Sequence, residues 1–336
     1  MGASIVGGRT LKILLTGGAG YVGSHVLRQL IAAGHEPVVF DDLSNGHRKA
    51  VGDVELVEGD ILDMELLEKV FQRDRFDCVM HFCGLIEAAE SVARPDKYYR
   101  VNVAGGANLL NAMVGADVGR IVFSSTAAVY GRPDCLPIDE DHPTKPINPY
   151  GHSKRMFEQM LEDYREAFGL GYASLRYFNA AGADESGEIG EAHRSESHLI
   201  PIVLRAALTG GAFTINGDDY DTRDGTPVRD FVHVNDLARA HVATLDVLDE
   251  GTAHIYNVGS GTGHTVREVV EVAQRVSGCD VPMTVGERRP GDTPTLVATA
   301  GRIERELGWK AQYTDLADII TTAWKWHSTH PEGFAD

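Results

Sequence analysis

Short apolar runs alternate with longer amphipathic segments over the first half of the chain. The apolar runs, each expected to form a strand, are Lys12–Leu15, Val38–Phe40, Val54–Val57, Cys78–Phe82, Ile121–Phe123 and Ala173–Tyr177. The segments between them with helical periodicity include Tyr21–Ala33, Met64–Phe71, Asp96–Met113 and Tyr150–Phe168. This alternation predicts an α/β fold, in which a doubly wound parallel sheet is joined by crossover helices. A ligand crevice is then expected at the carboxyl ends of the strands.

The pattern changes after Tyr177. Residues 179–198 are rich in Gly, Ser, Glu and His, which is typical of a loop. A helical pattern returns at Leu199–Leu208 and is followed by polar turns over Asn216–Thr226. The apolar run His254–Val258 predicts a last strand that returns to the sheet.

These changes predict two intergrown domains. The first covers residues 11–178, with a returning segment near 228–258. A smaller mixed α/β lobe covers 179–227 and 259–336 and caps the crevice. Residues 1–10 lack the charged start and apolar core of a signal peptide, so a disordered leader is expected there.

The segment TGGAGYVG, residues 16–23, directly follows the first predicted strand. Its glycines at 17, 20 and 23 allow a tight turn and a close approach to a ligand before a helix begins. The free N–H groups of a helix N-terminus suit a pyrophosphate. Asp41 and Asp42 end the next strand, where a carboxylate can bond ribose hydroxyls and repel a 2′-phosphate. The first domain is therefore predicted to be Rossmann-like and to bind NAD rather than NADP.

Tyr150 and Lys154 lie four residues apart at the start of a predicted helix, after Asn148 and Pro149. Tyrosine is a poor base at neutral pH, but a nearby ammonium and a positively charged nicotinamide favour the phenolate. Thr126 ends the strand before this helix and can bridge the tyrosine to a substrate oxygen. The predicted catalytic set is Tyr150, Lys154 and Thr126. The competing interpretation is an ordinary helix with one aromatic residue and one solvated lysine.

The strand that ends at Thr126 carries two more hydroxyls, Ser124 and Ser125. For these two we expect only hydrogen bonds to backbone groups at the strand end.

The charge balance excludes several partners. The 336-residue chain has 49 acidic and 31 basic residues and a net charge of −18, which argues against nucleic acid and anionic membranes. No apolar run is long enough to span a bilayer. The four cysteines form no CxxC pair and no metal-like group, so we expect no metal site and a reducing, cytoplasmic setting.

Beyond these local patterns, the chain resembles the UDP-glucose 4-epimerases (UDP-galactose 4-epimerases) of the extended short-chain dehydrogenase/reductase superfamily. The resemblance runs from Leu11 to the C-terminus. The segments that carry it are LLTGGAGYVGSH, EGDIL, ESVARPDKYYRVNVAG, VFSSTAAVYG, NPYGHSK, LRYFNAAGA, HLIP, GDDYDTRDGTPVRDFVHVNDLARAH, YNVGSG and RRPGDTP. The long segment from GDDYD to LARAH is the most specific, since it is not shared across the superfamily.

The resemblance implies a set of cofactor contacts. The implied NAD-binding residues are Gly17, Gly20, Tyr21, Val22, Gly23, Asp41, Asp42, Ser44, Asn45, Gly46, Asp60, Ile61, Phe82, Cys83, Gly84, Leu85, Ile86, Asn102, Tyr150, Lys154 and Phe178. Among these, Asp60 and Ile61 would flank adenine.

It also implies a substrate, a reaction and an assembly. The implied UDP-sugar contacts are Thr126, Asn179, His198, Leu199, Asn216, Arg229, Arg289, Asp292 and Leu296. The arginines suit a diphosphate, because guanidinium forms charge-assisted hydrogen bonds to phosphate oxygens. The implied reaction is reversible 4-epimerization of UDP-glucose and UDP-galactose through a transient 4-keto intermediate, using tightly bound NAD. The family also implies a homodimer.

The chain departs from the family pattern at several positions. Ile86 stands where many members carry lysine, Asn216 replaces an aromatic residue of the uracil pocket, and Phe231 replaces a tyrosine. Leu296, at a position that gates N-acetylated sugars, has intermediate size. A 4,6-dehydratase is disfavoured because Thr126 is followed by two alanines rather than an Asp-Glu pair.

These departures leave two kinds of alternative open. One is a 4-epimerase of UDP-xylose/arabinose, of a UDP-N-acetylhexosamine or of UDP-glucuronate. The other is a catalytically silent NAD-binding regulator.

Overall fold

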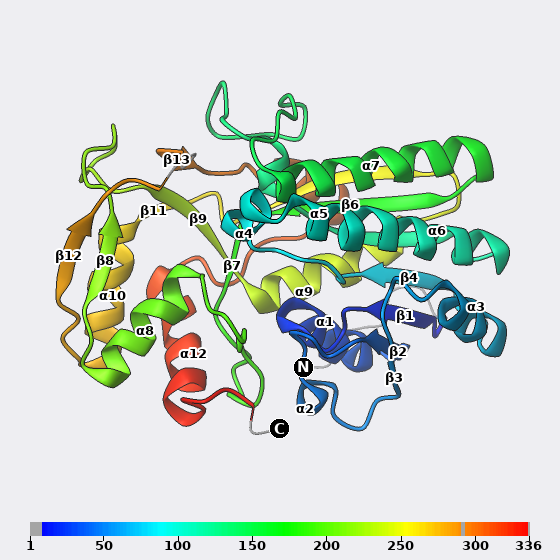
Figure 1. Ribbon diagram of the computed structural model, residues 1–336, viewed down its shortest axis with the longest axis horizontal. Coiled ribbons are helices and arrows are strands. Elements are labelled where there is room, and N and C mark those ends of the chain that lie inside the picture. The colour runs from blue at the N-terminus through cyan, green and yellow to red at the C-terminus, as the bar shows by residue number, and fades with distance from the viewer. Residues whose placement is uncertain (1–8, 290–292, 335–336) are drawn as a thin grey trace.

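The computed structural model describes residues 9–289 and 293–334, and its centre is a seven-stranded parallel sheet (Figure 1). The strand order is β10-β6-β5-β4-β1-β2-β3. The strands are β1 Lys12–Thr16, β2 Glu36–Asp41, β3 Leu56–Glu58, β4 Cys78–His81, β5 Arg120–Thr126, β6 Gly171–Tyr177 and β10 Ala253–Val258. This order is that of a doubly wound α/β sheet, and the predicted fold class is confirmed.

Helices cover both faces of this sheet because its strands are apolar on both sides. Along β1, Ile13 and Leu15 join one core cluster, whereas Leu14 joins the other. The first cluster is covered by α1 Tyr21–Ala32, α9 Val234–Ala243 and α11 Gly301–Leu307. The second is covered by α3 Met64–Arg73, α6 Gly106–Gly115 and α7 Pro149–Phe168. Smaller helical segments are α2 Arg48–Val51, α4 Ala88–Ala93, α5 Pro95–Tyr98, a π-helical segment Tyr99–Gly105, and 3-10 turns Ala127–Val129 and Thr244–Asp246.

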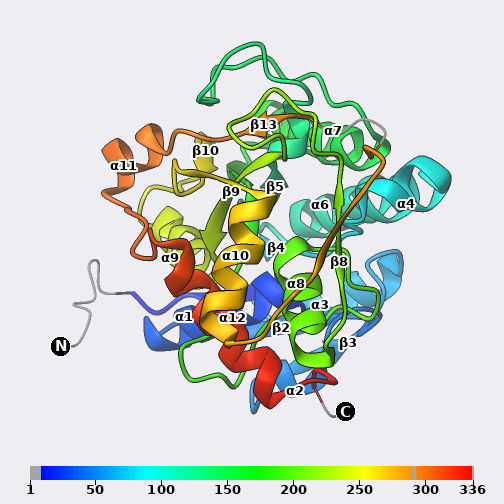
Figure 2. The same ribbon diagram turned by 90° about the vertical axis from the view of Figure 1, so that its left-hand side faces the viewer.

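A second lobe lies beside the carboxyl ends of the central strands (Figures 1 and 2). Its strand β9 Val228–His233 pairs with β7 Asn179–Ala181, β11 Gly263–Thr265 and β13 Thr295–Leu296. A separate parallel pair joins β8 Phe213–Asn216 and β12 Met283–Gly286. Helices α8 Leu199–Thr209, α10 Val266–Ser277 and α12 Leu316–Thr329 pack together over these strands in a core of their own.

The predicted strands and helices are largely confirmed, with two corrections. The helix expected over Asp96–Met113 is divided into α5, the π-helical segment and α6. Two glycines at the junction allow neighbouring side chains to pack closely against the backbone. A Cβ at Gly105 would lie 2.6 Å from Ile61, and a Cβ at Gly106 would lie 2.4 Å from Phe157. The loop expected over 179–198 begins with a strand, β7, whose backbone pairs with β9.

The domain boundaries stay a prediction. The run His254–Val258 does join the sheet through β10, but β9 of the expected returning segment lies in the smaller sheet. Most of the expected leader, residues 1–8, lies outside the described residues. Within the described part of the chain, no helix combines the length and the apolar character needed to cross a membrane.

Candidate active site

The glycine-rich turn connects β1 to α1 in a backbone conformation that requires glycine. Gly17 has φ +76°, and a Cβ there would lie 2.4 Å from the backbone nitrogen of Cys83. A Cβ at Gly23 would lie 2.3 Å from the carbonyl oxygen of Gly17. No side chain caps the helix at Gly20, so the first N–H groups of α1 remain available to a ligand. An uncapped helix start behind a closely approached turn suits a pyrophosphate.

The two predicted ribose ligands lie in different environments. Asp41, at the end of β2, is buried, and its carboxylate oxygens accept the backbone N–H groups of Ala19 at 3.0 Å and Leu43 at 2.9 Å. Burial raises the pKa of Asp41, and these two hydrogen bonds oppose the rise. Further donors such as ribose hydroxyls would stabilise the buried charge. Asp42 is exposed and accepts the N–H of Ser44 at 2.9 Å.

The loop after Asp42 places the remaining predicted ribose contacts. Ser44 and Asn45 are exposed, whereas Gly46 is buried. A Cβ at Gly46 would lie 2.9 Å from the Asp41 carboxylate, so this glycine lets the loop close over that side chain.

The segment after β4 returns toward the glycine-rich turn. The backbone N–H groups of Phe82 and Cys83 donate to the carbonyl of Thr16 at 2.7 and 2.9 Å. Gly84, Leu85 and Ile86 continue this half-buried segment.

Asn102, in the π-helical segment, connects this loop to the catalytic helix. Its amide accepts the N–H of Leu85 at 2.8 Å and donates to the carbonyl of Leu85 and to the hydroxyl of Ser153 at 3.0 and 2.9 Å. The predicted cofactor residue Asn102 therefore has a structural part as well, because it ties the loop to α7.

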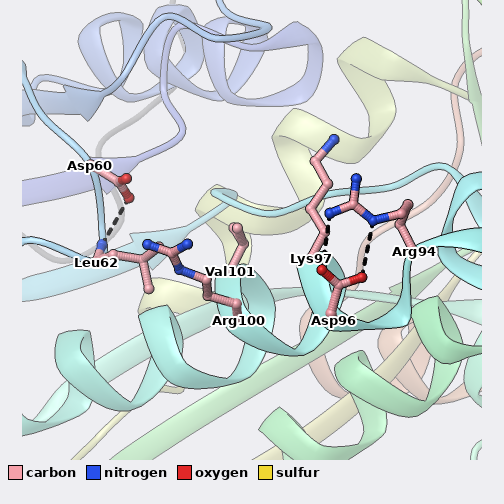
Figure 3. Close-up of a pocket in the computed structure, with 7 residues that line it drawn as sticks. All are labelled: Asp60, Leu62, Arg94, Asp96, Lys97, Arg100 and Val101. Carbon is pink, nitrogen blue, oxygen red and sulfur yellow. Dashed lines mark hydrogen bonds and ion pairs between the residues drawn. The ribbon is translucent and has the colours of Figure 1, made fainter.

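A pocket of about 270 Å³ opens beside Asp60, the residue expected near adenine. In Figure 3, the Arg100 side chain extends toward Leu62 and Asp60, whereas Arg94, Asp96 and Lys97 lie together on the opposite side. The lining residues are Asp60, Leu62, Arg94, Asp96, Lys97, Arg100 and Val101. Ile61, by contrast, is buried in the core against Gly105. The pocket does not include the predicted catalytic residues.

Thr126 ends β5, Tyr150 lies against it, and Lys154 contacts the backbone of Ser124 on the same strand. Helix α7 begins as expected, with Asn148 accepting the N–H of Gly151 at 2.8 Å and Pro149 in its first turn. A Cβ at Gly151 would lie 2.7 Å from the carbonyl oxygen of Ala128, so glycine allows α7 to start directly against the turn after Thr126. The Thr126 hydroxyl hydrogen-bonds the Tyr150 side chain.

Lys154 is buried one helical turn further along α7. Its side-chain nitrogen donates to the carbonyl of Ser124 at 3.0 Å and lies 5.0 Å from the ring centre of Phe123. Burial lowers the pKa of Lys154 to about 8, although Cys83 and Glu158 oppose this shift. Burial raises the pKa of Tyr150 to about 12, with Thr126 lowering it and Glu87 raising it. A further cation beside the phenol is therefore needed to make Tyr150 a base near neutral pH.

The hydroxyls of Ser124 and Ser125 bond side chains, which corrects the expectation that they satisfy backbone groups. Ser124 pairs with the phenol of Tyr177, and Ser125 donates to Glu158 at 2.6 Å. Glu158 is also paired with Arg176 at 2.7 Å, and both side chains are at least 95% buried. Because Glu158 follows Lys154 by four residues on α7, this pair anchors the catalytic helix to β6.

Sequence reasoning missed Tyr177, Glu158 and Arg176. A signal for Glu158 was present, since a residue four positions after Lys154 shares its helix face. Arg176 carried no comparable signal, because its partner comes from a different element.

The predicted substrate residues of the second lobe gather around β9. Asn179 on β7 donates to the carbonyl of Asp230 at 2.9 Å, and Leu296 on β13 pairs in register with Arg229. Arg229 is half-buried and donates to the carbonyls of Val228 and Thr293, both at 2.9 Å. Phe178 is buried in a small core that Leu296 flanks.

Other predicted substrate residues lie at the edges of this lobe. His198 directly precedes α8, Leu199 is the first residue of that helix, and Asn216 ends β8. Arg289 is exposed, whereas its neighbour Arg288 bonds Asp219 at 2.6 Å. Asp292 lies outside the described residues. Phe231 is buried in the core of this lobe.

Comparison with known proteins gives this geometry a context. The sequence model of the "NAD dependent epimerase/dehydratase family" matches residues 13–259. The chain belongs to this family. It is 47% identical to the UDP-glucose 4-epimerase of Lactobacillus helveticus, over 97% of this chain and 100% of that one. It is 51% identical to that of Azospirillum brasilense, over 94% of this chain and 91% of that one.

A solved epimerase structure has the same fold as this family member. The UDP-glucose 4-epimerase of Bifidobacterium longum, solved in complex with NAD⁺ and UDP, superposes with a TM-score of 0.93. It is 39% identical and the match covers 96% of this chain and 100% of that one. The site described above fits NAD on its own geometry, because α1 has an uncapped start and the buried carboxylate of Asp41 has room for further donors.

Proposed function

We propose that this protein is a UDP-glucose 4-epimerase, which interconverts UDP-glucose and UDP-galactose with NAD held as a bound cofactor. The observation that carries the proposal is that Tyr150 lies against Thr126, and Lys154 against the Ser124 carbonyl, at the end of β5 in the same sheet as the glycine-rich turn. The relatives that carry the name UDP-glucose 4-epimerase support the same activity as this geometry does.

Tyr150 is proposed as the base that takes the proton from the sugar 4-hydroxyl. Its partner Thr126 holds the phenol in place and can bond the same sugar oxygen. The Lys154 ammonium favours the phenolate, and its own hydrogen bond to Ser124 fixes where that charge lies. When bound, the nicotinamide of NAD would supply a reversible hydride acceptor for sugar C4, so that no net oxidation would result.

The residues proposed to hold NAD are those of the glycine-rich turn, Asp41 and the loop 82–86. They approach one another through backbone contacts, which leaves the start of α1 open. The proposed diphosphate ligands are Arg229 and Arg289, because guanidinium groups pair strongly with phosphate oxygens. Asn179, His198, Leu199, Asn216 and Leu296 are proposed to surround the rest of the UDP-sugar.

We also propose a homodimer and a cytoplasmic location. Helices α4 and α7 expose Val92 (66%) and Met156 (45%), which gives this side of the molecule apolar contacts for a second copy. The four cysteines are free, which suits a reducing compartment. Light scattering of the wild type and of Met156→Glu tests the dimer, which the variant is expected to weaken.

The direct test is to incubate the purified protein with UDP-galactose, without added NAD, and to separate the products by chromatography. UDP-glucose is expected, which would establish both the reaction and the retained cofactor. Tyr150→Phe is expected to retain NAD but to lose activity by about 10²–10⁴-fold, the usual contribution of a general base. Tyr164→Phe is the matched control, because the Tyr164 phenol lies on the same helix and bonds Asn111 at the surface. No product even after NAD is added, or equal activity in Tyr150→Phe, would overturn the proposal.

A further inference from the structure

The loop between β7 and α8 gathers four metal-ligating side chains. They are Glu191, His193, Glu196 and His198, and one ligand atom from each lies within 4.8 Å of all the others. All four come from eight consecutive residues, EAHRSESH from Glu191 onward, although the chain must curl for these side chains to converge. No metal site was expected from the sequence, because that expectation rested on the four cysteines alone.

The spacing of these atoms suits a small cation. His193 Nδ1 lies 3.2 Å from a Glu191 oxygen and 3.6 Å from a Glu196 oxygen. Tetrahedral zinc with bonds of 2.0–2.1 Å separates its ligand atoms by about 3.3 Å. His198 Nδ1 and Glu191 approach more closely and make a hydrogen bond. That pair must separate for a cation to enter, and the other ligand atoms, which lie within 4.8 Å of one another, must close around it.

Burial makes the two carboxylates dependent on a positive charge. The side chains of Glu191 and Glu196 are 3% and 2% exposed. A buried carboxylate without a counter-charge is strongly destabilising. A divalent cation with two neutral imidazoles would balance these two negative charges.

Individual atoms of His193 and Glu196 also face the centre of this cluster. His193 Nδ1 is buried and has no hydrogen bond of acceptable geometry among the described residues. One oxygen of Glu196 accepts the N–H groups of Ser197 at 2.9 Å and His198 at 2.8 Å. Its other oxygen is the one that faces His193. Such outer hydrogen bonds are what orient metal ligands in proteins.

The loop is held rigidly against α12. The indole N–H of Trp326 donates to the carbonyl of Glu191 at 2.9 Å. A Cβ at Gly190 would lie 2.3 Å from the Trp326 ring, so only glycine allows this approach. The four ligands are therefore arranged by the fold and do not depend on the cation for their positions.

We propose that Glu191, His193, Glu196 and His198 form a binding site for a divalent transition-metal cation of the zinc type. Four protein ligands leave no open position, so the cation has a structural role. It would tie the central-sheet part of the chain to the second lobe, because the ring of His193 lies 6.3 Å from that of Tyr21 in α1 and His198 directly precedes α8.

The competing state uses protons in place of the cation. Burial lowers the pKa of His193, but Glu191 and Glu196 outweigh burial and raise it to about 10. Two protonated histidines would then neutralise the two carboxylates. An experiment must therefore detect the metal itself and not only the order of the loop.

The test is to treat the full-length protein with a chelator, remove the chelator, and add Co²⁺ or Zn²⁺ alone. We expect one equivalent of tightly bound metal by titration calorimetry, and an intense visible Co²⁺ spectrum of the four-coordinate type. A pale six-coordinate spectrum, or no binding above that of buffer, would overturn the proposal. These readouts need no turnover, so they are independent of whether the protein is an epimerase.

Variants assign the binding to this cluster. His193→Ala and Glu196→Gln are each expected to weaken Co²⁺ binding at least 100-fold and to abolish the four-coordinate spectrum. Ser195→Ala, an exposed position in the same loop, is the matched control and is expected to bind as the wild type does. Circular dichroism identifies any variant that fails to fold, and the near-isosteric Glu196→Gln is the less disruptive of the two. Unchanged binding in both folded variants would place the metal elsewhere and contradict the proposal.

Discussion

At the residue scale, burying the charge of Lys154 carries a cost in free energy. Its side chain is 3% exposed and hydrogen-bonds one backbone carbonyl. Burial lowers its pKa from 10.5 to about 8, which corresponds to about 3 kcal/mol of free energy spent in burying the charge. A buried ammonium that destabilises the fold is consistent with the catalytic role proposed for Lys154.

Lys154→Met is accordingly expected to stabilise the NAD-free protein at pH 7. Removing the buried charge gains about 3 kcal/mol, and loss of the hydrogen bond to Ser124 offsets about 1 kcal/mol of this. The gain should shrink between pH 8 and 10.5, because there the folded wild type has released a proton that the unfolded chain still holds. Urea unfolding at pH 7 and pH 10 measures both effects. Lys69→Met, at an exposed lysine, is the control and should leave stability nearly unchanged at both pH values.

The same substitution should move the activity profile to higher pH. Burial raises the pKa of the Tyr150 phenol to about 12. If the Lys154 ammonium favours its ionisation in the loaded enzyme, as proposed, its loss moves that pKa higher still. The rate at pH 7 should fall by about 10²-fold or more and recover as the pH rises. Rates of UDP-galactose conversion between pH 6 and pH 10 test this expectation, and an unchanged profile would refute the charge argument.

Asp41 and Asp42 are expected to contribute unequally to cofactor choice. Asp41 is buried with its carboxylate oriented by two backbone N–H groups, whereas Asp42 is exposed. Asp41→Asn should weaken NAD binding and reduce the protein's preference for NAD over NADP, since the substitution removes the charge that repels a 2′-phosphate. Asp42→Asn should change this preference less. Calorimetric affinities for NAD and NADP decide the matter, and equal effects of the two variants would place both carboxylates at the ribose.

At the element scale, the position of α7 depends on a buried polar network. Glu158 on α7 accepts hydrogen bonds from Ser125 on β5 and Arg176 on β6, and Arg176 also donates to Tyr130 at 3.1 Å. The phenol of Tyr130 continues the network to Asn257 on β10 at 2.7 Å. The helix that carries Tyr150 and Lys154 is thus tied to three adjacent strands.

Glu158→Gln should destabilise the protein by about 3–5 kcal/mol, because it leaves the Arg176 charge buried without a counter-charge. Glu158→Leu combined with Arg176→Met should recover most of this loss, since no buried charge remains. Denaturant unfolding measures the free energy of both. If the single variant is as stable as the wild type, α7 is held by apolar packing instead.

At the scale of the whole molecule, the part built on the seven-stranded sheet and the second lobe meet at the start of α1. The phenol of Tyr21 donates to the carbonyl of Gly182 at 2.6 Å, and the loop beyond it leads through Glu191 to Trp326 on α12. A ligand bound at the N-terminus of α1 is therefore expected to stabilise both parts of the molecule.

Removal of NAD is expected to lower the melting temperature of the entire molecule by several degrees. A ligand retained at 1,000 times its dissociation constant stabilises the folded state by about 4 kcal/mol. Scanning calorimetry before and after stripping the cofactor tests this, with NAD added back as the control. Destabilisation confined to one of two separate transitions would show that the halves unfold independently.

Local sequence determined the elements and their chemistry. Alternating apolar runs specify the parallel sheet, glycines at 17 and 23 specify a turn that no other residue fits, and Asn148-Pro149 starts α7 where expected. These features depend on neighbours a few residues away, so the sequence alone reveals them. The domain boundaries and most site assignments remain predictions.

Only the tertiary structure decided which distant groups meet. The pairing of Glu158 with Arg176, the bond from Ser124 to Tyr177 and the burial of Lys154 join different elements. Even the four side chains from Glu191 to His198, which are close in sequence, converge only because the loop packs against Trp326 at Gly190. Packing across elements creates the burial that shifts pKa values and pairs charges, and no local pattern specifies that packing.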